Sequence, residues 1–198
     1  MTPETDEPRQ PLRADARRNR AKVLDAAEAA LAEHGISVPM EEIAQRAGVG
    51  VGTIYRQFAT KERLVEAIVV TRYERLADEA DALASADDAG VAFFGQFSRM
   101  VEEAAVKKTF ADTLAVAGVD IKAATSGVGQ RLVRSFEKLL TNAQVAGAVR
   151  GDVGIPEVMA VLAGTCLAAE HAAWDKHLQA QALTIVFDGL RPPPTRRQ

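Results

Sequence analysis

The residues with the greatest capacity for nucleophilic or metal chemistry are one cysteine and three histidines, and their spacing supports neither kind of site. Cys166 and His171 lie five residues apart in a segment with helical periodicity, so they point roughly 140° away from each other. His171 and Asp175 share a helix face but supply only two of the ligands that a zinc site needs. A single cysteine also excludes an internal disulfide and a thiolate zinc cluster. We therefore expect no enzymatic activity, no metal and no cofactor.

Basic side chains gather near the N-terminus although the whole chain has a net charge of −3. Six basic residues and one acid, Asp15, lie between Arg9 and Lys22. Residues 9–63 carry ten basic and seven acidic side chains, whereas residues 64–198 carry fourteen and seventeen. This uneven distribution indicates that the N-terminal part can face a polyanion.

The elements that must position these side chains are helices. Apolar residues recur at helical spacing throughout the middle of the chain, and prolines concentrate at its two ends. The fold class is therefore all-α, with helices expected at 14–34, 40–47, 51–57, 61–84, 88–106, 109–118, 127–146, 156–175 and 178–190. The polar, acidic start has no leader pattern, and the longest apolar run, 158–169, is too short to cross a bilayer, so we expect a cytoplasmic protein.

Two short helices joined by a tight turn are expected over residues 40–57, and the residue types fit a helix-turn-helix. Ala44 is small where two helices approach closely, and Gly48 can take the left-handed conformation that such a turn requires. Val49 and Ile54 supply apolar anchors on either side of the turn. The pattern alone leaves two interpretations open, a DNA-binding motif and an ordinary helical hairpin.

The wider string over residues 17–64 resembles the TetR family of bacterial transcriptional regulators. The similar segments are RRNRAKVLDAAEAALAEHG and VPMEEIAQRAGVGVGTIYRQFATKERLVEAI, with Gly48-Val49, 52–55, Phe58 and Lys61-Glu62 in step. The segment AGAVRGDV at 146–153 is similar to the family's link into its last two helices. The resemblance implies a disordered basic arm (1–12), a three-helix helix-turn-helix DNA-binding domain (13–60), an effector-binding and dimerisation domain (61–190) and a disordered tail (191–198).

In such a regulator, the side chains that contact phosphates position the protein on DNA. The resemblance makes the helix that begins near Val51 the recognition helix in the major groove. Thr53 and Tyr55 are then expected to hydrogen-bond phosphates, and Lys61 to meet one by charge. Arg17 and Arg18 are expected to contact DNA as well, whereas Arg9 and Arg13 either enter a minor groove or remain solvated.

The base sequence would be read by exposed positions of the same helix. Arg56 can offer two donors to guanine and Gln57 can pair with adenine. Val51 can touch a thymine methyl group, and Gly52 permits close backbone approach. A further phosphate contact is the alternative role for Arg56. The family's usual hydroxyl cap before the second helix is absent at Val38-Pro39, so a phosphate contact from that cap is not expected here.

The C-terminal part carries eight of the ten aromatic residues, which is where the family holds its effector. The candidate ligand-binding residues are Phe93, Phe97, Met100, Phe110, Leu114, Phe136, Met159, Cys166, Glu170, His171 and Trp174. Plain core packing is the alternative for the Phe and Met positions, because a stripe of such residues at helical spacing is more often core than cavity.

Helices 156–175 and 178–190 are expected to form a homodimer. The first carries apolar or small residues at 158, 161, 162, 165, 169 and 172, and the second carries them at 178, 182, 185, 186 and 190. Two-fold symmetry would match a pseudo-palindromic operator in double-stranded DNA. Packing of these helices within one subunit is the alternative.

Together these features predict a ligand-responsive transcriptional regulator. The family's common mode is a repressor that a small hydrophobic or amphipathic molecule releases from DNA. An all-α small-molecule carrier or enzyme with a vestigial helix-turn-helix is the alternative, and salt dependence of DNA affinity distinguishes the two.

Overall fold

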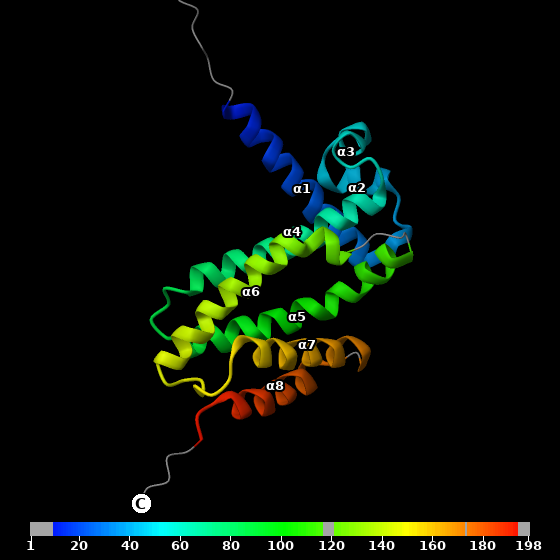
Figure 1. Ribbon diagram of the computed structural model, residues 1–198. Coiled ribbons are helices and arrows are strands. Elements are labelled where there is room, and N and C mark those ends of the chain that lie inside the picture. The colour runs from blue at the N-terminus through cyan, green and yellow to red at the C-terminus, as the bar shows by residue number, and fades with distance from the viewer. Residues whose placement is uncertain (1–9, 117–120, 173, 194–198) are drawn as a thin grey trace, which may run out of the picture. The chain divides into compact units, whose positions relative to one another are not determined.

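The computed structural model describes residues 10–116, 121–172 and 174–193, with side chains described except at 10–15, 17, 105–116 and 121–124. Its α-helices are α1 (Gln10–His34), α2 (Met40–Ala47), α3 (Val51–Gln57), α4 (Lys61–Leu83), α5 (Ala89–Val116), α6 (Ile121–Val145), α7 (Ile155–Ala172) and α8 (Lys176–Leu190) (Figure 1). A short 3-10 turn, η1 (Gly35–Ser37), follows α1. The described residues contain no strand, which confirms the all-α prediction.

Two of the expected helices form one. Residues 88–106 and 109–118 were expected as separate elements, but α5 runs without a break from Ala89 to Val116. Lys107 and Lys108 interrupt the apolar pattern, yet lysine is a good helix former, so the helix continues through them. Helix α6 begins at Ile121, six residues before the expected start at 127. The prediction was too short because Gly127 and Gly129 are poor helix formers and lower the helical propensity of the first turns.

The chain divides into two compact units, an N-terminal unit that ends at Ile68 and a C-terminal unit that begins at Val69. The division falls inside α4. In the N-terminal unit α2 packs against α1, and α3 packs against α2. Their shared core buries Ala27, Leu31, Ile43 and Ile54 almost completely. Burial of these apolar side chains stabilises α2 and α3, which have eight and seven residues and would be marginal as isolated helices.

The turn between α2 and α3 has the conformation that Gly48 was expected to supply. Gly48 ends α2 with φ 66° and ψ 33°, in the left-handed region that a side chain disfavours. The amide of Val49 donates to the Ala44 carbonyl at 3.0 Å, which closes the last turn. The start of α2 has no side-chain cap, because Pro39 occupies the N-cap and the Ser37 hydroxyl donates to the His34 carbonyl instead.

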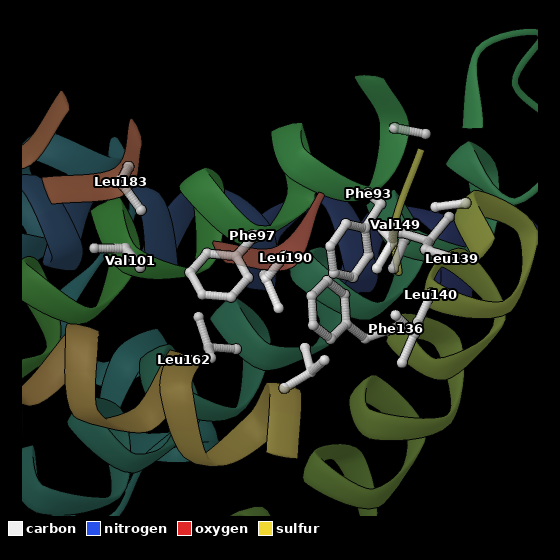
Figure 2. Close-up of a cluster of buried hydrophobic side chains, with 14 of the residues drawn as sticks. Phe93, Phe97, Val101, Phe136, Leu139, Leu140, Val149, Leu162, Leu183 and Leu190 are labelled. Atoms are coloured by element: carbon white, nitrogen blue, oxygen red, sulfur yellow. The ribbon is translucent and has the colours of Figure 1, made fainter. Parts of the chain in front are cut away.

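In the C-terminal unit α5 packs against both α6 and α7. Its core is built on stacked aromatic rings: Phe93 and Phe136 are 5.1 Å apart between ring centroids, and Phe97 lies 6.3 Å from Phe136. Figure 2 shows these rings between Leu162 of α7 and leucines of α6, with Leu190 of α8 beside them. All three rings are completely buried, so this cluster is the main hydrophobic core of the unit.

Two carboxylates set the boundaries of the last helices. The Glu157 side chain accepts a hydrogen bond from the Gly154 amide at 2.9 Å at the start of α7. Asp175, expected as the last residue of a helix over 156–175, is instead the N-cap of α8 and accepts from the Leu178 amide at 2.8 Å. Within the described residues no helix is both long and apolar enough to cross a membrane.

Candidate nucleic-acid interface and ligand cavity

Helix α3 presents a short outward surface from a buried anchor. Ile54 is completely buried and fixes the helix on the N-terminal unit. Gly52, Tyr55 and Arg56 are exposed, with 48% of Tyr55 accessible. Val51, Thr53 and Gln57 are half-buried. The exposed set coincides with positions expected to meet DNA, because the spacing that buries Ile54 turns its neighbours outward.

Arg56 lies folded back on its own helix. Its Nε donates to the Gly52 carbonyl at 3.2 Å and its Nη2 donates to the Thr53 hydroxyl at 3.1 Å. The Thr53 hydroxyl keeps its own hydrogen as a donor for another acceptor. The amide oxygen of Gln57 is buried and has no hydrogen-bond partner among the described residues. Reading a base through either side chain therefore requires a rotamer change, and both assignments stay predictions.

Lys61, at the start of α4, holds the segment that precedes α2. Its ammonium donates to the Ile36 carbonyl at 2.8 Å and to the Val38 carbonyl. Since an ammonium has three donors, one N–H remains for a phosphate. Sequence reasoning assigned Lys61 only to DNA, and the second role was missed because the Ile36 and Val38 carbonyls lie more than twenty residues away in the chain.

Lys61→Ala is expected to lower the free energy of unfolding by about 1.5–3 kcal/mol, because it removes charge-assisted hydrogen bonds to two carbonyls. Arg63→Ala is the matched control, since Arg63 is exposed and pairs only with the neighbouring Glu66 in the N-terminal unit as described. We expect that control to stay within about 0.5 kcal/mol of the parent chain in urea denaturation. Equal stability of the two variants would show that Lys61 has no structural role.

A cluster of charged side chains joins α1 to α2. Arg46 donates to Glu33 at 2.7 Å and to Glu42 at 3.1 Å, and its Nη2 lies 2.9 Å from His34 Nε2. The hydrogen bond from Arg46 lowers the pKa of Glu33 below its ordinary value. The i,i+4 spacing of Glu42 and Arg46 was visible in the sequence, whereas the Glu33 contact depends on how the two helices pack.

Arg20 supplies a second link, between α1 and the residue after α3. Its guanidinium lies 4.6 Å from the centroid of the buried Phe58 ring, within the range of a cation–π contact. The N–H of Phe58 donates to the Ile54 carbonyl and ends α3. The contact of Arg20 with Phe58 fixes the end of α3 on α1, next to the exposed residues of α3. Arg17 and Arg18 lie on α1, with Arg18 exposed, and the side chain of Arg17 lies outside the described residues.

The C-terminal unit contains a cavity of about 450 Å³ between α4, α5, α6 and α7. Its described lining is Val69, Arg72, Tyr73, Leu76, Met100, Glu103, Ala104, Gly129, Leu132, Val133, Met159, Leu162, Ala163, Cys166, Leu167 and Glu170. The wall is mainly apolar with a few polar groups, the composition typical of a small-molecule site, and its size lies in the usual range.

Four of the expected ligand-binding residues line this cavity: Met100, Met159, Cys166 and Glu170. The structure places Phe93, Phe97 and Phe136 in the core instead, where their rings pack against one another and leave no free face. His171 is exposed, and Trp174 packs against the core rather than lining the cavity. The side chains of Phe110 and Leu114 lie outside the described residues.

Sequence reasoning missed an ion pair in the cavity wall. Arg72 Nη1 lies 2.8 Å from Glu103 Oε2, with 11% and 21% of the two side chains exposed. The signal was present in the sequence, because Arg72 falls on the same helical face as the apolar Val69 and Leu76. A charged residue inside an apolar stripe indicates a partly buried polar site.

An aspartate fixes α4 to α6 close to this wall. Asp81 accepts a hydrogen bond from the Ser135 hydroxyl at 2.6 Å and one from Arg131 at 2.8 Å. These two contacts, with that of Ser135 the larger, lower the pKa of Asp81 below its ordinary value. Two of the helices that enclose the cavity are therefore linked by charge as well as by packing.

Helices α7 and α8 leave apolar side chains on their outer surface. The exposed ones are Val161 and Leu167 on α7 and Leu178 and Ile185 on α8, with 75% of Ile185 accessible. Positions 158, 162, 165 and 169, expected at a subunit interface, are instead buried within the C-terminal unit. Val161, 164 and 167 lie on the side of α7 that the core leaves exposed, and Leu167 also borders the cavity.

Two family descriptions match this chain. Residues 23–68 match the bacterial regulatory proteins of the TetR family, and residues 88–192 match the C-terminal domain of SbtR-like transcriptional regulators. The second match alone covers more than half of the chain. A comparison with curated proteins finds none that matches.

Solved structures agree with these matches. A TetR transcription regulatory protein from Mycobacterium vanbaalenii is 39% identical, with 91% of this chain and 99% of that chain covered and a TM-score of 0.77. A TetR transcriptional regulator from Streptomyces coelicolor is 32% identical over 87% and 98% of the two chains, with a TM-score of 0.72. The regulator RolR, solved with resorcinol, shares the fold at 19% identity over 89% of each chain and a TM-score of 0.56. The helix-turn-helix unit, the helical C-terminal unit and these similarities lead to one conclusion: the chain belongs to the TetR family of DNA-binding transcriptional regulators, which are not enzymes.

Proposed function

We propose that this protein is a homodimeric repressor that binds a pseudo-palindromic operator and releases it when a small hydrophobic or amphipathic molecule fills the cavity of the C-terminal unit. The observation that carries the proposal is the cavity itself, about 450 Å³ with a mainly apolar wall, in a chain whose N-terminal unit is a helix-turn-helix. A site of this kind in a DNA-binding protein has no need of catalytic groups. We place the protein in the cytoplasm, with the DNA it binds.

Release requires that the ligand bind one conformation better than the other. A ligand shifts an equilibrium only by its differential affinity for the two states. A ligand that favours a dimer in which the two α3 helices no longer match successive major grooves would weaken operator binding. RolR, a protein of the same fold, was solved with resorcinol, which supports a small-molecule effector for this chain too.

The exposed apolar face of α7 and α8 supports the dimer. Val161, Leu167, Leu178 and Ile185 lie outside in one subunit, and covering them in a partner would remove this apolar surface from water. A two-fold interface pairs the same surface of both subunits, so the two α3 helices would be related by the same symmetry as an inverted repeat.

The test of release uses a thermal-shift screen of alkyl and aryl alcohols, acids and amines of about ten carbons, followed by titration of each stabilising compound into the protein–operator complex. We expect at least one compound to raise the melting temperature and to lower operator affinity. Gly129→Leu serves as the variant with a filled cavity. A Cβ at Gly129 meets nothing within 4 Å, and because Gly129 lines the cavity, the leucine side chain would occupy part of it. Compounds that stabilise the protein without changing operator affinity would contradict ligand-controlled release.

Arg56→Ala is expected to cost about 1–3 kcal/mol of binding free energy, mainly at one base pair of each half-site. The reason is that a guanidinium can donate two hydrogen bonds to guanine once it leaves its contacts with Gly52 and Thr53. The measurement compares affinities for the operator and for single-base variants of it. Weakening that is the same for every base variant would identify Arg56 as a phosphate contact instead.

A further inference from the structure

The charges around the cavity are unequal in sign. Among its described lining residues, three carry a full charge: Arg72 is positive, and Glu103 and Glu170 are negative. We propose that the effector is a cationic amphiphile, an apolar molecule with one ammonium or comparable positive group, held at the carboxylate of Glu170. This inference rests on the proposed ligand-controlled function and adds the charge of the ligand to it.

The one cation of the described wall already has a carboxylate partner. Arg72 Nη1 lies 2.8 Å from Glu103 Oε2, and only 11% of the Arg72 side chain is exposed. The other carboxylate oxygen of Glu103 lies 3.1 Å from Arg99 Nη2. An anionic ligand would meet two carboxylates and a guanidinium whose charge Glu103 already offsets. That arrangement is unfavourable in a mainly apolar cavity, where charges are poorly screened.

Glu170 differs from Arg72 and Glu103 in its contacts. It is half-buried, it lines the cavity, and it has neither an ion pair nor a hydrogen bond within the described parts of the chain. A carboxylate beside an apolar wall loses part of its hydration without compensation. A cation that enters the cavity would restore the missing partner, so binding of a positive group is favoured at this position.

The two carboxylates lie toward the same end of the cavity. Helices α5 and α7 run in the same direction (Figure 1), and Cys166 Sγ lies 3.9 Å from the Met100 carbonyl oxygen. Glu103 follows Met100 by almost one turn, and Glu170 follows Cys166 by about one turn. Met159 and Leu162 precede Cys166 and line the other end. The cavity thus has a charged end, which holds Glu170 and the Arg72–Glu103 ion pair, and an apolar end.

Such a division fits a molecule with an apolar body and a positive group at one end. The apolar end excludes water and accepts the body of the ligand. The Tyr73 ring also lines the cavity, and an aromatic face attracts a cation. A ligand that carries charge in the middle of its apolar body would match neither end.

The test uses three probes that share a chain and differ in the head group: decylammonium and decanoate below their micelle concentrations, and 1-decanol below its solubility limit. Isothermal titration calorimetry on the full chain at neutral pH gives the three dissociation constants. We expect decylammonium to bind about tenfold more tightly than 1-decanol, and decanoate to bind most weakly. Decanoate binding as tightly as decylammonium would overturn the inference.

Two matched variants test whether Glu170 causes the preference for decylammonium. Glu170→Gln keeps the shape and removes the charge, so we expect decylammonium to lose most of its advantage while 1-decanol binding is unchanged. Glu137→Gln removes an exposed α6 carboxylate that does not line the cavity, and should leave all three affinities as they are. An unchanged ammonium preference in Glu170→Gln would overturn the role of Glu170.

A second pair of variants shows whether the probes bind in the cavity at all. Gly129→Leu should weaken all three probes at least tenfold, whereas Gly95→Leu, at an exposed helical glycine outside the cavity, should not. Equal binding to both variants would place the probes elsewhere and overturn the inference. If 1-decanol binds in the cavity and weakens operator binding but decylammonium is no better, the cationic ligand is excluded while ligand-controlled release stands.

Discussion

Phe136→Ala is expected to lower the free energy of unfolding of the C-terminal unit by about 3–5 kcal/mol. Phe136 is completely buried, and its ring stacks on Phe93 and lies against Phe97. Truncation removes these contacts and leaves a void that rigid helical neighbours fill only partly. Urea denaturation followed by circular dichroism measures the loss, and the aromatic cluster in Figure 2 is the part of the molecule that it probes.

Met159→Ala is the matched comparison, because Met159 is only partly buried and borders the existing cavity. We expect it to cost less than Phe136→Ala, since fewer contacts are lost and the affected wall already faces open space. If Phe136→Ala cost under about 1 kcal/mol and instead changed ligand affinity, Phe136 would be a cavity residue, which is one of the two interpretations that the sequence pattern left open.

Operator affinity is expected to fall roughly 10³-fold between about 50 and 200 mM salt. If Arg17, Arg18 and Lys61 each neutralise one phosphate, a dimer makes about six such contacts, and each released counterion contributes to the slope of log affinity against log salt. Fluorescence anisotropy at several salt concentrations measures this slope. A flat response would favour the carrier or enzyme interpretation over a DNA-binding regulator.

A charge-removing variant tests the origin of that slope. Arg18→Gln should reduce the slope by about two for a dimer, one unit for each subunit, and should weaken binding to all sequences alike. Arg134→Gln is the control, because Arg134 is an exposed cation of α6 in the C-terminal unit. An equal change in both variants would mean that the salt effect reports overall charge rather than a contact on α1.

The sequence predicted the N-terminal unit well because its constraints are local. Gly48 marks the turn, and the burial of Ile54 follows from its place in a short helix. Asp175 shows the limit of local reasoning: it was expected as the last residue of a helix over 156–175, whereas its side chain caps the next helix. A capping side chain overrides periodicity, because it satisfies amide groups that a helix start leaves unpaired.

The cavity was predicted only in part because its composition resembles that of a core. Phe93 and Met100 both lie on the buried side of α5, yet only Met100 borders the cavity. Which of two apolar residues meets a void depends on how three or four helices pack, and periodicity within one helix cannot decide it. Arg72, a charged residue within an apolar stripe, was a signal of the cavity that the sequence analysis did not use.

The most direct test of the central claim is a selection of random duplex DNA on the purified protein at moderate salt, with sequencing of the retained fraction. We expect an enriched inverted repeat, with half-sites spaced so that two α3 helices of a dimer enter successive major grooves. No enriched motif from a folded dimer, or a motif without two-fold symmetry, would contradict a dimeric regulator that reads its operator through α3.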